Sequence, residues 1–166
     1  PMMSRATVLA SMMLGYILAA TAAGLQPAGK GWLEVPAKDL ADMATLIDTD
    51  CAGNHWQPLG QTGGMTVDYC PYSWLHEPNG LVTLQTRYQS PSETLMLEQG
   101  FDCAVNRHTL LVVARFTPAG RLTALKVRNA DEAKAALQPL GDDFSQLLHQ
   151  LACQLSSQHP AGVNWE

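Results

Sequence analysis

Four cysteines, Cys51, Cys70, Cys103 and Cys153, constrain the fold of this 166-residue chain more than any other feature. In a small exported chain, an even number of cysteines is typical of a disulfide framework, and four cysteines allow three pairings. We predict Cys51–Cys70 and Cys103–Cys153, because nested or crossed pairings would tie the two halves of the chain together and no other feature requires that. Each bridge would stabilise the fold by about 2–4 kcal/mol, mostly by restricting the unfolded chain.

The N-terminal segment indicates that the chain is exported. Arg5 supplies one positive charge, residues 6–29 carry no charge, and Ala20-Thr21-Ala22 matches the small-residue rule for cleavage of a secretory signal peptide. We therefore predict a signal peptide at residues 1–22. The uncharged run would also suffice for a retained membrane anchor, which needs about 20 residues. Both alternatives place the folded domain in the periplasm, at the cell surface or in the medium, where disulfides persist.

The remaining chain is long enough for one domain and too short for two. We expect a flexible lead-in at residues 23–31, a single domain at residues 32–157 and a frayed tail at residues 158–166. Alternating apolar residues and flanking turn residues predict most of the strands. Pro71 is expected to end one of them, Gly100 to break another, and residues 43–48 form either a strand or part of a helical turn that begins at Asp39. The strands are expected at residues 32–35, 65–69, 81–88, 94–103, 110–116 and 122–127, the last two joined by a hairpin turn at residues 117–120.

Helical periodicity appears late in the chain. Asp142 or Asp143 can cap a helix N-terminus, and a weaker helix at residues 131–137 must end at Pro139. Strands followed by one packing helix predict an α+β fold, in which an antiparallel meander packs against a C-terminal α-helix and two disulfides brace the domain. The buried face of that helix is expected to contain Phe144, Leu147, Leu148, Leu151, Ala152 and Leu155.

Several classes of chemistry find little support in the sequence. The net charge is −5 and the basic residues are scattered, so we expect no nucleic-acid partner. Cys51 with His55 and Cys103 with His108 could form a metal site, but disulfides are favoured in an oxidising compartment. Asp48 and Asp50 lack the glycine and distal glutamate of a calcium loop. We predict no metal and no cofactor.

An enzyme is not expected either. The serines at positions 73, 90 and 92 sit in turn-like segments without a nucleophile motif, and paired cysteines leave no free thiol. The five histidines lie in polar or loop-like contexts and are expected to be solvated surface groups. They are His55, His76, His108, His149 and His159.

Four aromatic residues, Trp56, Tyr69, Tyr72 and Trp74, gather around the loop that a Cys51–Cys70 bridge would close. Core packing would explain such a cluster. The functional hypothesis is a partner-binding surface, because Trp and Tyr are favoured interface anchors and a stapled loop presents them at little entropic cost.

Short motifs from position 81 to position 153 resemble the bacterial surface-adhesin protein E family. The resemblance implies an exported domain whose sheet packs on a C-terminal helix, with a disulfide from the strand ending in Cys103 to that helix and a capacity to form a homodimer. Cys51 and Cys70 are outside the family pattern, and no lipobox is present. The matching residues are Thr83-Leu84-Gln85-Thr86-Arg87-Tyr88, Phe101-Asp102-Cys103-Ala104, Arg107, Gly120, Leu137-Gln138-Pro139, Leu148 and Leu151-Ala152-Cys153, together with Trp32 and Asp48.

The resemblance also implies a function. Characterised members of that family bind host matrix and plasma proteins, so the leading hypothesis is a non-enzymatic, adhesin-like protein of the bacterial envelope that binds a protein partner of this kind. Contact with a membrane would involve only an uncleaved N-terminal segment. The alternative is a periplasmic accessory or structural protein of an envelope assembly.

Overall fold

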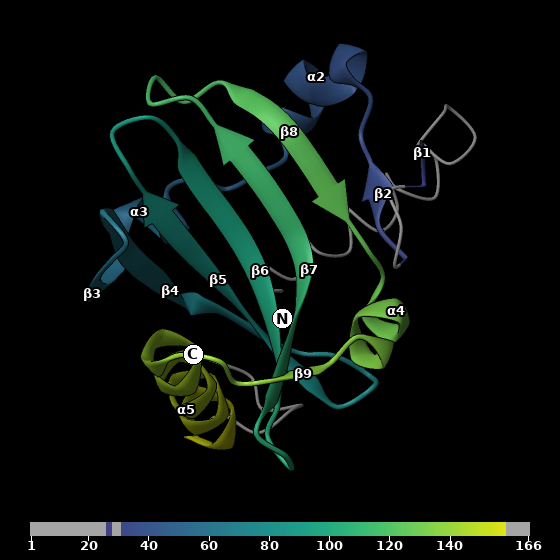
Figure 1. The fold of residues 1–166 in the computed structure, drawn as a ribbon, viewed down its shortest axis with the longest axis vertical. Coiled ribbons are helices and arrows are strands. Elements are labelled where there is room, and N and C mark those ends of the chain that lie inside the picture. Colours follow the sequence, from purple (N-terminus) through teal and green to yellow (C-terminus); the bar gives the residue numbers. More distant parts are fainter. Residues whose placement is uncertain (1–25, 28–30, 159–166) are drawn as a thin grey trace.

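The computed structural model describes residues 26–27 and 31–158. Within these residues the chain forms one nine-stranded antiparallel sheet with the order β1-β2-β8-β7-β6-β5-β4-β3, and β9 pairs with β7 beside this path (Figure 1). The strands are β1 (Gln26–Pro27), β2 (Leu33–Glu34), β3 (Gln57–Thr62), β4 (Met65–His76), β5 (Leu81–Gln89), β6 (Thr94–Asp102), β7 (Arg107–Phe116), β8 (Leu122–Val127) and β9 (Gln138–Pro139).

Short helices connect the strands, and one long helix ends the described chain. Figure 1 shows this last helix, α5, at the lower end of the sheet and α2 near the upper end of β8. The helical elements are η1 (Ala37–Asp39), α2 (Leu40–Ala44), α3 (Cys51–Asn54), α4 (Ala130–Ala135) and α5 (Asp143–Gln158).

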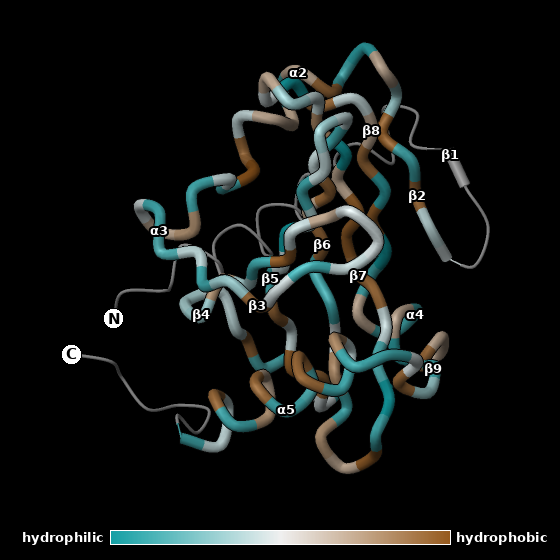
Figure 2. Tube along the Cα trace, turned by 60° about the vertical axis from the view of Figure 1, so that its left-hand side comes forward, coloured by the Kyte–Doolittle hydropathy of each residue, from teal (hydrophilic) through white to brown (hydrophobic). Residues whose placement is uncertain are grey.

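Each face of the sheet has its own hydrophobic cluster. On one face, called here the α5 face, Val82, Leu84 and Phe101 pack with Leu148 and Ala152 of α5. Figure 2 shows apolar residues alternating with polar ones along α5, as expected for a helix that buries a single stripe. Because side chains alternate along a strand, neighbouring positions of the same strands point to the opposite face.

The opposite face, called here the α2 face, is covered by α2 and the segment that follows it. Its cluster includes Leu40 and Met43 of α2 with Met96 and Leu125 of the sheet. Leu46, Ile47 and Trp56 are partly buried against the same cluster. The sheet is therefore the middle layer of the domain, with covering elements on both sides.

The predicted fold class is confirmed. The six-strand meander from β3 to β8 packs against a C-terminal helix, and the two disulfides join Cys51 to Cys70 and Cys103 to Cys153, as predicted. The hairpin turn at residues 117–120 is also present: the backbone N–H of Gly120 donates to the Thr117 carbonyl at 2.9 Å, and Gly120 has φ +92°. The predicted signal peptide at residues 1–22 lies outside the described residues.

Several local predictions are wrong. Pro71 does not end its strand, since β4 continues to His76. The proline lies where the pairing with β5 is irregular, between Cys70 and Leu75. Proline is tolerated at such bulges because the ladder already lacks a hydrogen bond there. Edge strand β3 was not predicted, because the glycines at positions 60, 63 and 64 indicate a turn. Residues 40–44 form the helical alternative, and the segment that follows them is not a strand.

Two predictions about packing also need correction. Gly100 does not interrupt β6, whose register shift lies between Glu98 and Gln99. In α5, Leu147 is 38% exposed, whereas Ser145 and Ser156 are buried. The buried stripe is thus rotated from the predicted one, and the buried serine hydroxyls are satisfied locally, since Ser145 donates to the Asp142 carbonyl and Ser156 to the Cys153 carbonyl.

Replacing Gly100 should destabilise the domain. A Cβ at this position would lie 2.9 Å from Leu111 Cδ1 and 3.1 Å from Thr109 Cγ2. We expect Gly100→Ala to lower the free energy of unfolding by about 1–3 kcal/mol, as over-packing usually does. Gly141→Ala is the matched control, because a Cβ there meets nothing within 4 Å. Urea unfolding measures both variants, and equal stabilities would contradict the close packing at Gly100.

Candidate functional site

The segment from Asp48 to Trp56 is a left-handed turn closed by a disulfide. Cys51, Ala52 and Asn54 have φ values of +47°, +53° and +72°, a region that L-residues other than glycine rarely adopt. The Cys51–Cys70 bridge, with a Cα–Cα distance of 5.6 Å, fixes this turn to β4. Such a run of unfavourable backbone conformations persists only where the surroundings determine it.

Hydrogen bonds from three directions determine the turn. The Asp48 carboxylate accepts from the backbone N–H of Asp50 at 2.9 Å and from that of Ala52 at 3.3 Å. The Trp56 indole N–H donates to the Thr49 carbonyl at 3.1 Å. From the sheet, the Gln85 amide donates to the Asp48 carbonyl, also at 3.1 Å. We therefore interpret the turn as a rigid element with a fixed position over the α2 face.

Trp56 is a half-buried residue of the α2 face. It packs against the hydrophobic cluster there, and the Arg87 guanidinium lies over its ring at 4.4 Å. Arg87 Nη2 also donates to the Asp68 carboxylate at 2.7 Å, which holds the cation in place over the indole. This arrangement gives Trp56 a clear packing role.

The other three aromatic residues lie on different surfaces. Tyr69 and Trp74 are partly buried against the hydrophobic cluster of the α5 face. Tyr72 is 60% exposed, and its ring makes an edge contact with the His55 ring at 5.2 Å. The structure thus distributes the four predicted partner-binding residues over both faces and leaves one pair, Tyr72 with His55, open to solvent.

The expectation that the histidines are solvated is wrong for three of them. His76, His108 and His149 are partly buried, whereas His55 is exposed and His159 lies outside the described residues. Within the described chain, His76 Nε2 and His108 Nδ1 are buried without a hydrogen-bond partner. Burial lowers the pKa of His108, and the nearby Asp142 carboxylate partly offsets this effect.

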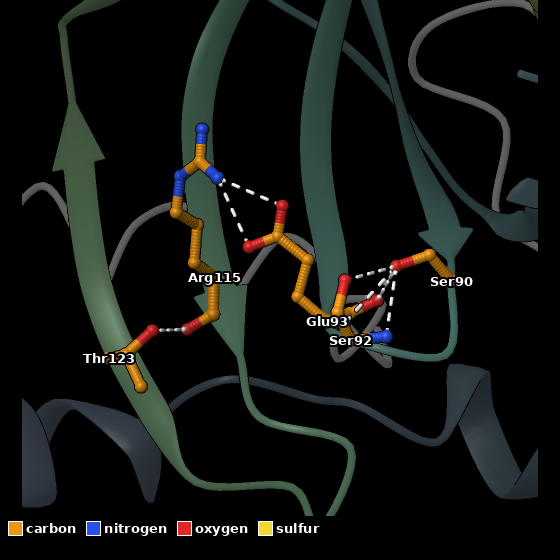
Figure 3. Close-up of polar contacts among 5 residues, drawn as sticks. All are labelled: Ser90, Ser92, Glu93, Arg115 and Thr123. Atoms are coloured by element: carbon orange, nitrogen blue, oxygen red, sulfur yellow. Dashed lines mark hydrogen bonds and ion pairs between the residues drawn. The ribbon is translucent and has the colours of Figure 1, made fainter.

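Polar side chains at the upper end of the sheet brace the turn between β5 and β6 (Figure 3). Arg115 Nη1 donates to both carboxylate oxygens of Glu93, at 3.0 and 3.1 Å. The Ser90 hydroxyl accepts from the backbone N–H groups of Ser92 and Glu93. Thr123 donates to the Arg115 carbonyl at 3.2 Å. The hydrogen bonds of Ser90 are therefore part of the turn geometry.

Burial perturbs two carboxyl groups, Glu98 and Glu77. Glu98 faces the same side as Met96, between Gln85 of β5 and Val112 of β7. Burial and, to a smaller extent, the negative charge of Glu77 raise the pKa of Glu98 to about 7. Burial also raises the pKa of Glu77. In the part of the chain that the structure describes, no group of three or more His, Cys, Asp or Glu residues is arranged to hold a metal ion.

Comparisons of the chain with family models, with curated proteins and with solved structures find no match. The resemblance to the surface-adhesin protein E family therefore stays a prediction. Among the described residues, no helix has the length and apolar character needed to cross a membrane.

Trp56 and Tyr72 should differ sharply in what they contribute to stability. We expect Trp56→Ala to lower the free energy of unfolding by about 2–4 kcal/mol, because it removes a packed ring and leaves Arg87 without its aromatic partner. Tyr72→Ala should change it by no more than about 0.5 kcal/mol, because the side chain is largely in water. Thermal and urea unfolding followed by circular dichroism would measure both, and similar losses would contradict these placements.

Glu98 should make the stability of the domain depend on pH. Below about pH 4.5 its carboxyl is protonated in both the folded and the unfolded state. As the pH rises from there to about 7, the unfolded chain releases this proton while the folded state retains it, so the free energy of unfolding falls. Above about pH 7 Glu98 is ionised in both states, and the free energy of unfolding stays lowered by the cost of burying its charge. We expect Glu98→Gln to stabilise the protein by about 3 kcal/mol at alkaline pH and far less near the lower limit.

Unfolding measured across this pH range would test the effect. Glu34→Gln is the control, because Glu34 is exposed on short strand β2. Destabilisation by Glu98→Gln at every pH would contradict the expected penalty and show that the carboxyl group stabilises the fold in both of its protonation states.

Proposed function

We propose that this protein is a non-enzymatic binding module of the bacterial envelope that presents the turn around Cys51–Cys70 to a protein partner. The observation that carries the proposal is the Tyr72–His55 pair. Tyr72 is the most exposed of the large hydrophobic residues in the described chain, and it lies beside a left-handed turn that several contacts fix. A rigid, exposed aromatic side chain loses little conformational entropy on binding, which is why tyrosines serve as interface anchors.

The four aromatic residues take different roles in this proposal. Trp56 packs on the α2 face beneath the turn, whereas Trp74 and Tyr69 pack on the opposite α5 face. Direct contact with a partner is assigned to Tyr72, His55 and the exposed backbone of the turn. The proposed binding surface therefore lies near the Cys51–Cys70 bridge and contains only solvent-exposed groups.

The compartment follows from the covalent structure. Two disulfides and no free cysteine in the described chain indicate that the protein folds in an oxidising, non-cytoplasmic environment. A matrix or plasma protein of a host is the partner class that the surface-adhesin resemblance implies. The periplasmic accessory role is the alternative, in which the same surface contacts a component of the envelope.

Binding to immobilised extracellular-matrix and plasma proteins would test the proposal. We expect the oxidised protein to bind at least one of them, and Tyr72→Ala to raise the Kd about tenfold or more, as loss of an interface anchor does. Val105→Ala is the matched control, since Val105 is 47% exposed in the turn between β6 and β7, near the other disulfide.

Biolayer interferometry on the two variants separates the outcomes. Absence of binding across the panel would contradict the matrix and plasma partner class and favour the periplasmic alternative. Equal weakening by Tyr72→Ala and Val105→Ala would show that the proposed surface is wrong.

A further inference from the structure

The two disulfides differ in their access to solvent. Cys51 is 0% exposed and Cys70 is 2% exposed, so no reagent reaches either sulfur unless the domain opens. Cys103 is exposed in the turn at residues 103–106, and its partner Cys153 on α5 is partly exposed. Thiol–disulfide exchange requires a thiolate to approach one sulfur directly, so access decides which bridge can react in the folded state.

A histidine lies against the exposed bridge. Both ring nitrogens of His149 are 3.9 Å from Cys153 Sγ, one helical turn away on α5. His149 Nε2 is 2.8 Å from the carbonyl oxygen of Asp102 and 3.2 Å from that of Val105. Because both partners are acceptors, Nε2 carries a proton. The polar His149 ring beside Cys153 Sγ would stabilise a negative charge that forms on that sulfur.

Non-covalent contacts also hold Cys103 and Cys153 close together, in addition to the disulfide. The same His149 hydrogen bonds join α5 to the carbonyl groups on either side of Cys103. The turn itself is closed by Ala104 N–H donating to the Asp102 carboxylate at 3.0 Å. Leu148 and Ala152 anchor α5 in the hydrophobic cluster of its face. Opening the disulfide would therefore leave the two cysteines next to each other.

From this arrangement we propose that Cys103–Cys153 is a site of thiol–disulfide exchange with an external thiol, in which His149 positions and stabilises the leaving sulfur. The external thiolate attacks Sγ of the exposed residue Cys103, the Cys103–Cys153 bond breaks, and Cys153 leaves as a thiolate beside the His149 ring. A second thiol attacks the mixed disulfide and releases Cys103. Two electrons pass from the two thiols to the protein, and the thiols become a disulfide.

The experiment exposes the folded, oxidised protein to reduced glutathione in one arm and to a reduced dithiol protein of the thioredoxin type in the other. Samples are quenched with acid, alkylated and mapped by mass spectrometry. We expect Cys103–Cys153 to open at least about 100-fold faster than Cys51–Cys70, because the buried bridge reacts only through opening of the domain. The glutathione adduct should lie on Cys103. Reaction in either arm supports the proposal and identifies the kind of thiol that reacts, whereas failure in both overturns it.

Two variants separate the role of His149 from a merely structural one. His149→Gln should slow the exchange about 3- to 10-fold, because the leaving sulfur loses its stabilising partner, and should weaken the preference for an adduct on Cys103. Gln154→Ala is the control, since Gln154 is exposed on the same helix and should change neither quantity. An unchanged adduct distribution in His149→Gln would overturn the positioning role.

A third measurement tests whether exchange is compatible with the fold. The double variant Cys103→Ser with Cys153→Ser should retain a cooperative thermal transition and the native near-ultraviolet circular dichroism. Loss of that transition, or opening of both disulfides at one rate in the original protein, would mean that the exposed bridge opens only with unfolding and would overturn the proposal.

Discussion

Each face of the sheet is covered by an element that a disulfide attaches to it, and the rest of the structure depends on this constraint. Cys70 pairs in register with Gln85, so its bridge to Cys51 fixes the left-handed turn over the α2 face. Cys103 follows the last residue of β6, and its bridge to Cys153 fixes α5 on the other face. A sheet with only one covered face would leave apolar side chains in water, so both attachments contribute to a complete core.

Much of this fold is predictable from local sequence signals, whereas the position of the histidines is not. The meander and the late helix follow from alternation, helical periodicity and turn residues, and the disulfide pairs follow from preferring bridges that do not tie the two halves of the chain together. His76 and His108 sit in polar contexts along the chain, yet sheet register aligns them with apolar neighbours. His76 pairs with Val82, Val82 with Phe101, and Phe101 with His108, so four adjacent strands place these residues in one row beneath α5. The burial of His76 and His108 thus depends on residues of neighbouring strands that are distant in sequence.

The aromatic residues show a related limit. Tyr69 and Trp74 are five positions apart on β4, an odd spacing that would place them on opposite faces of a regular strand. The irregularity between Cys70 and Leu75 changes the alternation, and both residues reach the α5 face. Trp56 approaches the sheet from the other side, because it belongs to the disulfide-closed turn. The four aromatic residues, although close in sequence, thus lie in three separate environments. Of the four, only Tyr72 is exposed enough to contact a partner.

The two bridges also show that stabilisation and reactivity are separate properties of a disulfide. The bridges span 50 and 19 residues, so loop-closure entropy alone favours Cys103–Cys153 as the stronger constraint on the unfolded chain, by about 1 kcal/mol. That contribution arises in the unfolded state and does not require the sulfurs to be buried in the folded one. Access to a thiol depends on the folded state, where Cys103 is exposed and Cys51 is not. The bridge with the larger entropic effect is therefore also the one that the folded protein can exchange, since His149 and the core residues of α5 hold its two ends together when the covalent bond is open.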